Sequence, residues 1–344
     1  MRKISELTYR SFLAGVIIDY LDYLDNLGFS IREPAYVLGV IDRFLDETKI
    51  DSIRQCDSRF WLDLLAQHQD RIKISNFHIW KNIFQKFCRY LVRQGWITEN
   101  PAALFPIPKL QPYRPYVFSI DELRRFLRFL QEQESRSIRP LTLFRSRSRY
   151  VLYHLLYGCG LRVSESVRLA VEDYSAEQHT LFIRPSKFRK DRLIPIGSRA
   201  ASNLEHLLEL REDLFGIPPE GPFFLALPKR RPYDPSSISN YFRGVMVHLG
   251  IYRPQSVDQG CWQGTPHLHE LRRAFAVHRL MRWYREQVDV DAKLPLLATY
   301  MGHSSFVYTK TYLTLTRQLL SEAGHRFSHS FDHLDWINHD SELG

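Results

Sequence analysis

A proline-rich stretch near residue 100 sets the first limit on the fold. Five prolines lie between Asn100 and residue 115, at positions 101, 106, 108, 112 and 115. Proline fixes φ and lacks a backbone N–H, so such a stretch is stiff and extended and suits a connection between domains. With 344 residues, the chain is also too long for one ordinary core. We therefore expect a first domain at residues 1–111, a linker at 112–117, a second domain at 118–324 and a tail at 325–344.

Apolar residues at helical spacing dominate the first domain. The pattern predicts helices at residues 10–28, around 37–45, around 60–67 and at 75–94. The face of the last helix that points away from its apolar stripe is basic, with Lys81, Lys86, Arg89 and Arg93. We expect this face to contact a polyanion; an ordinary solvated helix face is the alternative.

The second domain alternates helix signals with one strand pair. Ser119 and Glu122 form a capping-box pattern, which predicts a helix start. A further helix is expected from about residue 149 to 157, and the glycines at 158 and 160 end it. Residues 180–183 and 192–196 read as strands joined by a turn at 186–191. The expected fold class is therefore mainly α with a small antiparallel β-sheet.

Composition favours a nucleic-acid partner. The formal net charge is +9, while 44% hydrophobic and 25% charged residues describe a globular protein. The four cysteines lie far apart and show no metal-ligand spacing, which favours a reducing compartment. No stretch reaches the length of a membrane span, and Asp19 interrupts the apolar run near the N-terminus, so neither an anchor nor a signal peptide is expected.

Several residues in the second domain suit phosphoryl transfer to a tyrosine. His269 and Arg272 share one helix face, Arg162 follows a glycine turn, and Lys187 lies in a hairpin turn. His303 follows Gly302, and Tyr312 comes nine positions later. Arginines bind non-bridging phosphate oxygens, a histidine can accept the phenolic proton, and a lysine can protonate the leaving alkoxide. Histidines at 267 and 269 point apart on a helix, so we expect no metal site.

These motifs resemble those of the tyrosine recombinases, which include phage integrases and Xer-type and Cre-type enzymes. Residues 160–165 look like the first arginine box, 186–197 like the β-hairpin lysine, 269–272 like the H-x-x-R box, and 302–312 like the G-H…Y ending. The resemblance covers the second domain almost throughout. The first domain is similar in pattern to the family's helical, SAM-like core-binding domain.

The resemblance implies specific roles. Tyr312 would attack a DNA phosphodiester to form a 3′-phosphotyrosyl bond, and Arg162, Arg272 and His303 would hold the phosphate. His269 would accept the phenolic proton and Lys187 would protonate the 5′-oxygen. Because the covalent link retains the bond energy, neither a metal nor another cofactor is required. Specific double-stranded DNA sites, a homo-tetramer on DNA and a cytoplasmic, nucleoid-associated location are also implied, and accessory proteins remain open.

Secondary expectations concern neighbouring residues. Glu165 is expected to orient an arginine or His269. Further DNA contacts are expected from four basic residues, Lys229, Arg230, Arg231 and Arg273. The long segment before Gly302 looks like that of recombinases from transposons and integrative elements. The alternatives are a non-catalytic DNA-binding relative of the same fold and an enzyme similar to type IB topoisomerases.

Overall fold

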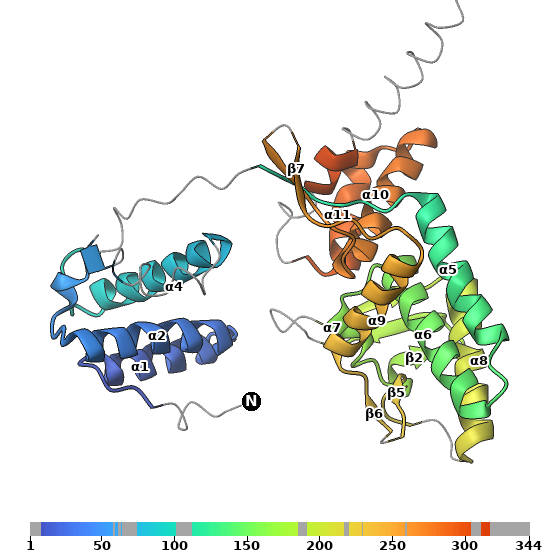
Figure 1. Ribbon diagram of the computed structural model, residues 1–344, viewed down its shortest axis with the longest axis horizontal. Coiled ribbons are helices and arrows are strands. Elements are labelled where there is room, and N and C mark those ends of the chain that lie inside the picture. The colour runs from blue at the N-terminus through green and yellow to red at the C-terminus, as the bar shows by residue number, and fades with distance from the viewer. Residues whose placement is uncertain are drawn as a thin grey trace, which may run out of the picture. The chain divides into compact units, whose positions relative to one another are not determined.

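The computed structural model divides the chain into two compact units, Met1–Pro112 and Tyr113–Gly344 (Figure 1). It describes residues 8–57, 59–60, 63, 74–100, 112–184, 191–216, 220–228, 230–258, 260–303 and 311–316. The expectation of a mainly helical chain with small sheets is confirmed. Most of the helix expected at residues 60–67 lies outside the described residues.

Three long helices build the described core of the first unit. They are α1 (Ala14–Asn26), α2 (Arg32–Thr48) and α4 (Ile74–Arg93), and a short 3-10 turn, η2, covers Ile53–Gln55. Each helix presents an apolar face to the others, and the aromatic ring of Tyr20 packs against those of Phe87 and Tyr90. Buried Asp42 fixes the start of α1 because its carboxylate accepts hydrogen bonds from the backbone N–H groups of Arg10 and Ser11.

Helix α6 (Pro140–Gly158) is the centre of the second unit. It packs against α5 (Ile120–Ser135), α8 (Ser198–Phe215) and α10 (His269–Arg285), and its buried side chains form much of the core. The helix begins nine residues before the predicted start, because Pro140 occupies the first turn, where a missing N–H costs nothing. The capping box of α5 is confirmed: Ser119 Oγ accepts from the Glu122 N–H, and Glu122 accepts from the Ser119 N–H.

Short strands connect these helices. One antiparallel sheet has the order β2 (Tyr174–Ser175), β3 (Thr180–Ile183) and β4 (Arg192–Pro195), and follows the short helices α7 (Val163–Ser166) and η3 (Val171–Asp173). A second pair, β5 (Leu225–Ala226) and β6 (Arg231–Pro232), precedes α9 (Pro235–His248). The strand pair 180–183 and 192–195 and the helix start at Asp234 are confirmed.

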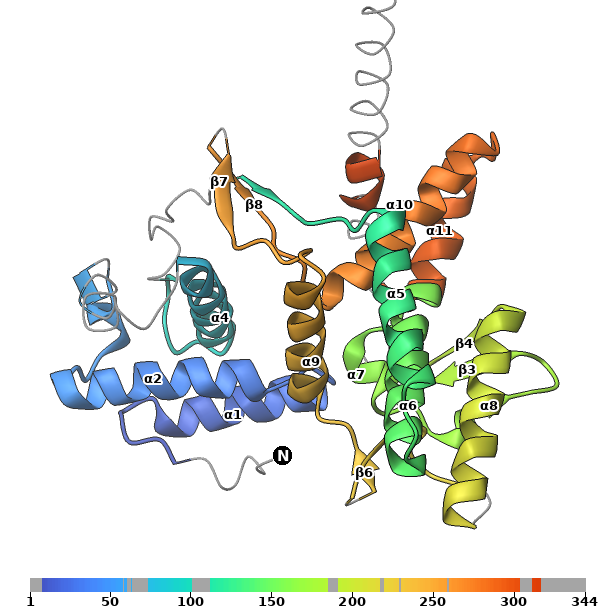
Figure 2. The ribbon, with the colours of Figure 1, turned by 45° about the vertical axis from the view of Figure 1, so that its right-hand side comes forward.

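A third sheet joins the start of the second unit to a hairpin far along the chain. Strand β1 (Tyr113–Arg114) pairs in parallel with β8 (Cys261–Gln263), which pairs antiparallel with β7 (Ser256–Asp258). Beyond this hairpin, α10 and α11 (Val290–Met301) lie together at one end of the unit (Figure 2). The ends of α6 and α11 and the start of α10 carry the residues of the candidate site.

Candidate active site

A glycine turn delivers Arg162 to the site. After α6 ends, Gly160 takes a left-handed conformation with φ +60°, and a Cβ there would lie 2.4 Å from the ring of Phe275. Only glycine fits this approach, because any side chain would meet both the backbone strain and the ring. The turn places Arg162 at the N-cap of α7, where its backbone N–H donates to Glu165 Oε2 at 2.9 Å.

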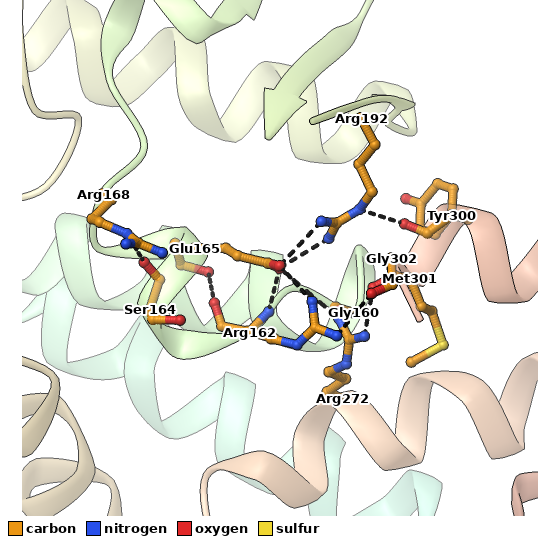
Figure 3. Close-up of polar contacts among 11 residues, drawn as sticks. Gly160, Arg162, Ser164, Glu165, Arg168, Arg192, Arg272, Tyr300, Met301 and Gly302 are labelled. Carbon is orange, nitrogen blue, oxygen red and sulfur yellow. Dashed lines mark hydrogen bonds and ion pairs between the residues drawn. The ribbon is translucent and has the colours of Figure 1, made fainter. Parts of the chain in front are cut away.

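The fully buried carboxylate of Glu165 accepts hydrogen bonds from two arginine side chains (Figure 3). Arg162 Nη1 donates to Oε1 at 2.7 Å, and Arg192 donates to Oε1 and Oε2 at 3.0 and 2.9 Å. Arg272 Nη1 lies 3.9 Å from Oε2. Burial favours the neutral acid, but the hydrogen bonds and charge of Arg192, together with the bonds from Arg162, lower the pKa of Glu165 to about 2.

The same three arginines cap the end of α11. Arg192 Nε donates to the carbonyl of Tyr300 at 2.8 Å, and Arg162 Nη2 donates to that of Gly302 at 2.8 Å. Arg272 donates to the carbonyls of Met301 and Gly160, both at 2.5 Å. The last carbonyls of a helix have no partner within it and carry its partial negative charge, so guanidinium groups stabilise them. Three successive carbonyls therefore hold three guanidiniums in a fixed arrangement.

His303 and Tyr312 lie beside this cluster. Gly302 ends α11 with φ +65°, and the His303 N–H donates to the carbonyl of Ala298 at 3.0 Å. Tyr312, in a helical segment at residues 311–316, is buried, and its ring centroid lies 5.7 Å from that of His303. Burial and the charge of Arg162 lower the pKa of Arg272 to about 10, while Glu165 and Tyr312 oppose this shift. Tyr312 therefore lies within electrostatic reach of Arg272.

Burial, and then the neighbouring arginines, lower the pKa of both histidines. Burial, followed by the charges of Arg272 and Arg162, lowers the pKa of His303 to about 4. The pKa of His269 is also lowered, mainly by burial and secondly by the charges of Arg272 and Arg273. Part of this residue nevertheless stays exposed. A neutral imidazole can accept a proton, and a bound anion would raise its pKa toward the working range.

The structure thus brings together six of the residues singled out in the sequence: Arg162, Glu165, His269, Arg272, His303 and Tyr312. Lys187 and Lys229 lie outside the described residues. Arg273 is ion-paired with Glu270, and Arg230 stacks over the ring of Phe215. Arg231 is exposed in β6.

The predicted position of Lys81 on the open basic face is wrong. Lys81 is only 4% exposed and does not lie on the open basic face of α4. It stands three and seven residues before Phe84 and Cys88, which are fully buried, so it shares their side of the helix. Lys86, Arg89 and Arg93 do lie on the exposed side, and Arg93 stacks over the Tyr23 ring at 4.8 Å.

Arg192 is the site residue that sequence reasoning missed. The sequence pattern places it only in a strand, and an arginine beside a turn usually faces solvent. A signal was present in Glu165: a carboxylate expected to orient an arginine or His269 has about four acceptor positions, so it can bind a second donor. The identity of that second donor depends on how the strands pair, so the spacing of residues in the sequence does not predict it.

Neither a metal-binding cluster nor a membrane-spanning helix occurs among the described residues. They contain no group of three or more histidine, cysteine, aspartate or glutamate side chains that could hold a metal ion. Among the described helices, none combines the length and apolar character needed to cross a bilayer.

Comparisons with known proteins agree on one family. The model of the phage integrase family matches residues 117–318. "Putative integrase/recombinase y4rB" of Sinorhizobium fredii is 28% identical over 91% of this chain and 96% of its own length. Tyrosine recombinase XerC of Chlorobaculum parvum is 28% identical over 69% of this chain and 68% of its own. The Tn1549 transposon integrase, solved with a circular intermediate DNA, shares the fold with a TM-score of 0.61 and 15% identity, over 86% of this chain and 94% of that one.

Proposed function

The chain belongs to the phage integrase family and is a tyrosine site-specific recombinase, and we propose that Tyr312 is the nucleophile with which it cuts and rejoins DNA. The Tyr312 oxygen attacks a phosphodiester, forms a 3′-phosphotyrosyl bond and releases a 5′-hydroxyl. Attack by a 5′-hydroxyl of another strand then reverses the step and frees the tyrosine. The phosphate ester count is unchanged throughout, so no energy source is consumed.

The observation that carries this proposal is the convergence of cations on the end of α11, next to His303. Arg162 and Arg272 donate to the carbonyls of Gly302 and Met301, so their guanidiniums lie at the two residues that precede His303. We assign them to the non-bridging oxygens of the phosphate, with His303 as a further donor. Cationic donors held in place before the reaction stabilise the charge that develops on phosphorus without reorganising.

Proton transfer falls to two other residues. His269 accepts the phenolic proton of Tyr312 as the oxygen attacks, and its lowered pKa leaves it neutral and able to do so. Lys187 donates a proton to the departing 5′-oxygen; this assignment rests on its motif alone. Glu165 positions Arg162 through their direct hydrogen bonds.

We assign the DNA contacts outside the site to basic residues of both units. In the first unit these are Lys86, Arg89 and Arg93 on α4. In the second unit, Arg230, Arg231, Arg273 and Lys229 are the assigned contacts. We propose that the protein acts as a tetramer on two DNA sites in the cytoplasm, in association with the nucleoid, and serves the integration or transposition of a mobile element. The transposon integrase that shares its fold supports this role.

Trapping the covalent adduct tests the nucleophile. A nicked suicide substrate loses the short strand that carries the 5′-hydroxyl, so the adduct accumulates. With duplexes drawn from the genomic flanks of the gene, we expect an adduct whose peptide maps to Tyr312. Tyr312→Phe should bind the same DNA without forming it. Tyr300→Phe is the matched control, because the Tyr300 hydroxyl donates instead to the carbonyl of Pro195, and this variant should still form the adduct.

Other outcomes separate the alternatives. An adduct that persists in Tyr312→Phe overturns the assignment. DNA binding with no adduct in the wild type would favour a non-catalytic relative. Relaxation of supercoiled plasmid that lacks any recombination site would favour topoisomerase-like activity, whereas we expect dependence on the site.

A further inference from the structure

We propose that Arg192 is a positioning residue of this site: by pairing with Glu165, it leaves Arg162 and Arg272 oriented and positively charged for the phosphate. The inference rests on the proposed function, because it concerns the same phosphate. Arg192 itself is not assigned a contact with DNA. It acts through the carboxylate and through the end of α11.

The hydrogen bonds of Glu165 carry the first step. An ionised carboxylate has about four acceptor positions. Arg192 fills two of them in a bidentate fork, and Arg162 fills the others with Nη1 and its backbone N–H. Because the side chain of Glu165 is fully buried, water cannot replace a lost donor. Without Arg192, the carboxylate would take its missing hydrogen bonds from Arg162 or from Arg272, which lies 3.9 Å away.

Every nitrogen of the Arg192 guanidinium is hydrogen-bonded within the protein. Its Nε donates to the Tyr300 carbonyl at 2.8 Å, so all three nitrogens of the guanidinium are engaged. The Cα of Gly302 packs closely against the Arg192 guanidinium: a Cβ added at position 302 would lie 2.8 Å from Arg192 Nη1. The Arg192 side chain is 11% exposed, between the 24% of Arg162 and the 2% of Arg272. This guanidinium is therefore held between a carboxylate, a carbonyl and a glycine (Figure 3).

Charge carries the second step. The cluster holds three guanidiniums and one carboxylate, so its net charge is two positive charges. A phosphodiester carries one negative charge, and a second develops on its oxygens as the tyrosine oxygen attacks. Arg192 and Glu165 cancel each other, which leaves the charges of Arg162 and Arg272 to match that transition state. Loss of Arg192 would leave Glu165 to cancel one of them.

A double-mutant cycle tests this role. The variants are Arg192→Met, Arg192→Lys, Glu165→Gln and Glu165→Gln/Arg192→Met, with Arg168→Met as the control for loss of a nearby positive charge. Arg168 is exposed just after α7 and donates to the Ser164 carbonyl. For each, we measure the rate of adduct formation at saturating DNA, the dissociation constant for the same half-site, and the thermal midpoint.

For Arg192→Met we expect adduct formation to slow by roughly 10- to 100-fold, as for residues that orient a reacting group, with the dissociation constant within about twofold. Arg192→Lys keeps the positive charge, so its rate of adduct formation should fall less than that of Arg192→Met. The double variant, in which the unpaired carboxylate is gone, should form the adduct faster than Arg192→Met. Arg168→Met should match the wild type.

The inference is overturned if Arg192→Met forms the adduct at the wild-type rate, or if the losses of the two single variants simply multiply in the double variant. If Arg192 only stabilised the fold, the two single losses in the rate of adduct formation would multiply in the double variant. If Arg192→Met fails to fold, Arg192→Lys and the double variant decide. The inference is then overturned if Arg192→Lys forms the adduct at the wild-type rate, or if the double variant forms it much more slowly than Glu165→Gln, because Arg192 acts through the carboxylate that Glu165→Gln removes. Failure of the proposed function is separate, since it would appear as a wild type without a Tyr312 adduct.

Discussion

Replacing Gly302 with alanine would measure how firmly the arginine cluster is held. Gly302 has φ +65°, so alanine introduces backbone strain of about 1–2 kcal/mol. The new Cβ would also lie 2.8, 3.0 and 3.2 Å from Nη1, Cζ and Cδ of Arg192. Relief requires the Arg192 guanidinium to move, and it is bonded to buried Glu165. Full rupture of a buried ion pair costs about 3–5 kcal/mol, so we expect a total loss of about 2–5 kcal/mol.

Gly216 offers a matched control in the same unit. It ends α8 with φ +61°, and a Cβ there would meet nothing within 4 Å. Gly216→Ala should therefore cost the backbone strain alone, about 1–2 kcal/mol. For a unit of this size, each 1 kcal/mol lowers the thermal midpoint by roughly 2–4 °C.

The assay is thermal unfolding of both variants, read from the transition of the second unit, together with the rate of adduct formation. Gly302→Ala should lower the midpoint several degrees more than Gly216→Ala, and it alone should slow cleavage, because Arg192 and Arg162 shift together. Equal midpoints and equal cleavage rates in the two variants would refute the idea that the glycine protects a rigid cluster.

Three further predictions concern the cap, acid sensitivity and DNA binding. Ser119→Ala removes the acceptor for the Glu122 N–H and should lower the urea midpoint by an amount equivalent to about 1 kcal/mol; an unchanged midpoint would contradict the capping role. The pKa of His303 is about 4 when folded and about 6.5 when unfolded, so only the unfolded chain gains a proton between these values and stability falls as the pH drops through them. His303→Gln should consequently lose less stability than the wild type between about pH 7 and about pH 5, and equal losses would argue against it. Arg89→Ala and Lys86→Ala should each reduce the slope of log affinity against log salt by about 1, whereas a wild-type slope would remove these residues from the DNA face.

Local signals predicted the helices and caps well because they depend on neighbours in the chain. The capping box at Ser119 and the N-cap at Asp234 rest on side chains within three residues of each other. Glycine turns at Gly160 and Gly302 were equally readable. The motif spacing also selected six residues that meet in the folded chain.

Contacts between distant segments could not be predicted in this way. Arg192 reaches Glu165 across 27 positions and Tyr300 across 108, and no local pattern records either pairing. Lys81 was misplaced for a related reason: its helix buries a stripe wide enough to include a lysine, and the width of a buried stripe is set by the partners that pack on it. Strand β1 pairs with a hairpin about 150 residues later and left no signal in the linker.

That pairing decides where a separate catalytic fragment should begin. A fragment cut at the capping box would lack Tyr113 and Arg114, and β8 would become an open edge able to recruit a strand from another molecule. It would also lack Tyr116, whose hydroxyl donates to Glu122 at 2.6 Å. A fragment that starts at Pro112 keeps both features, so we expect it to stay monomeric where the shorter one aggregates.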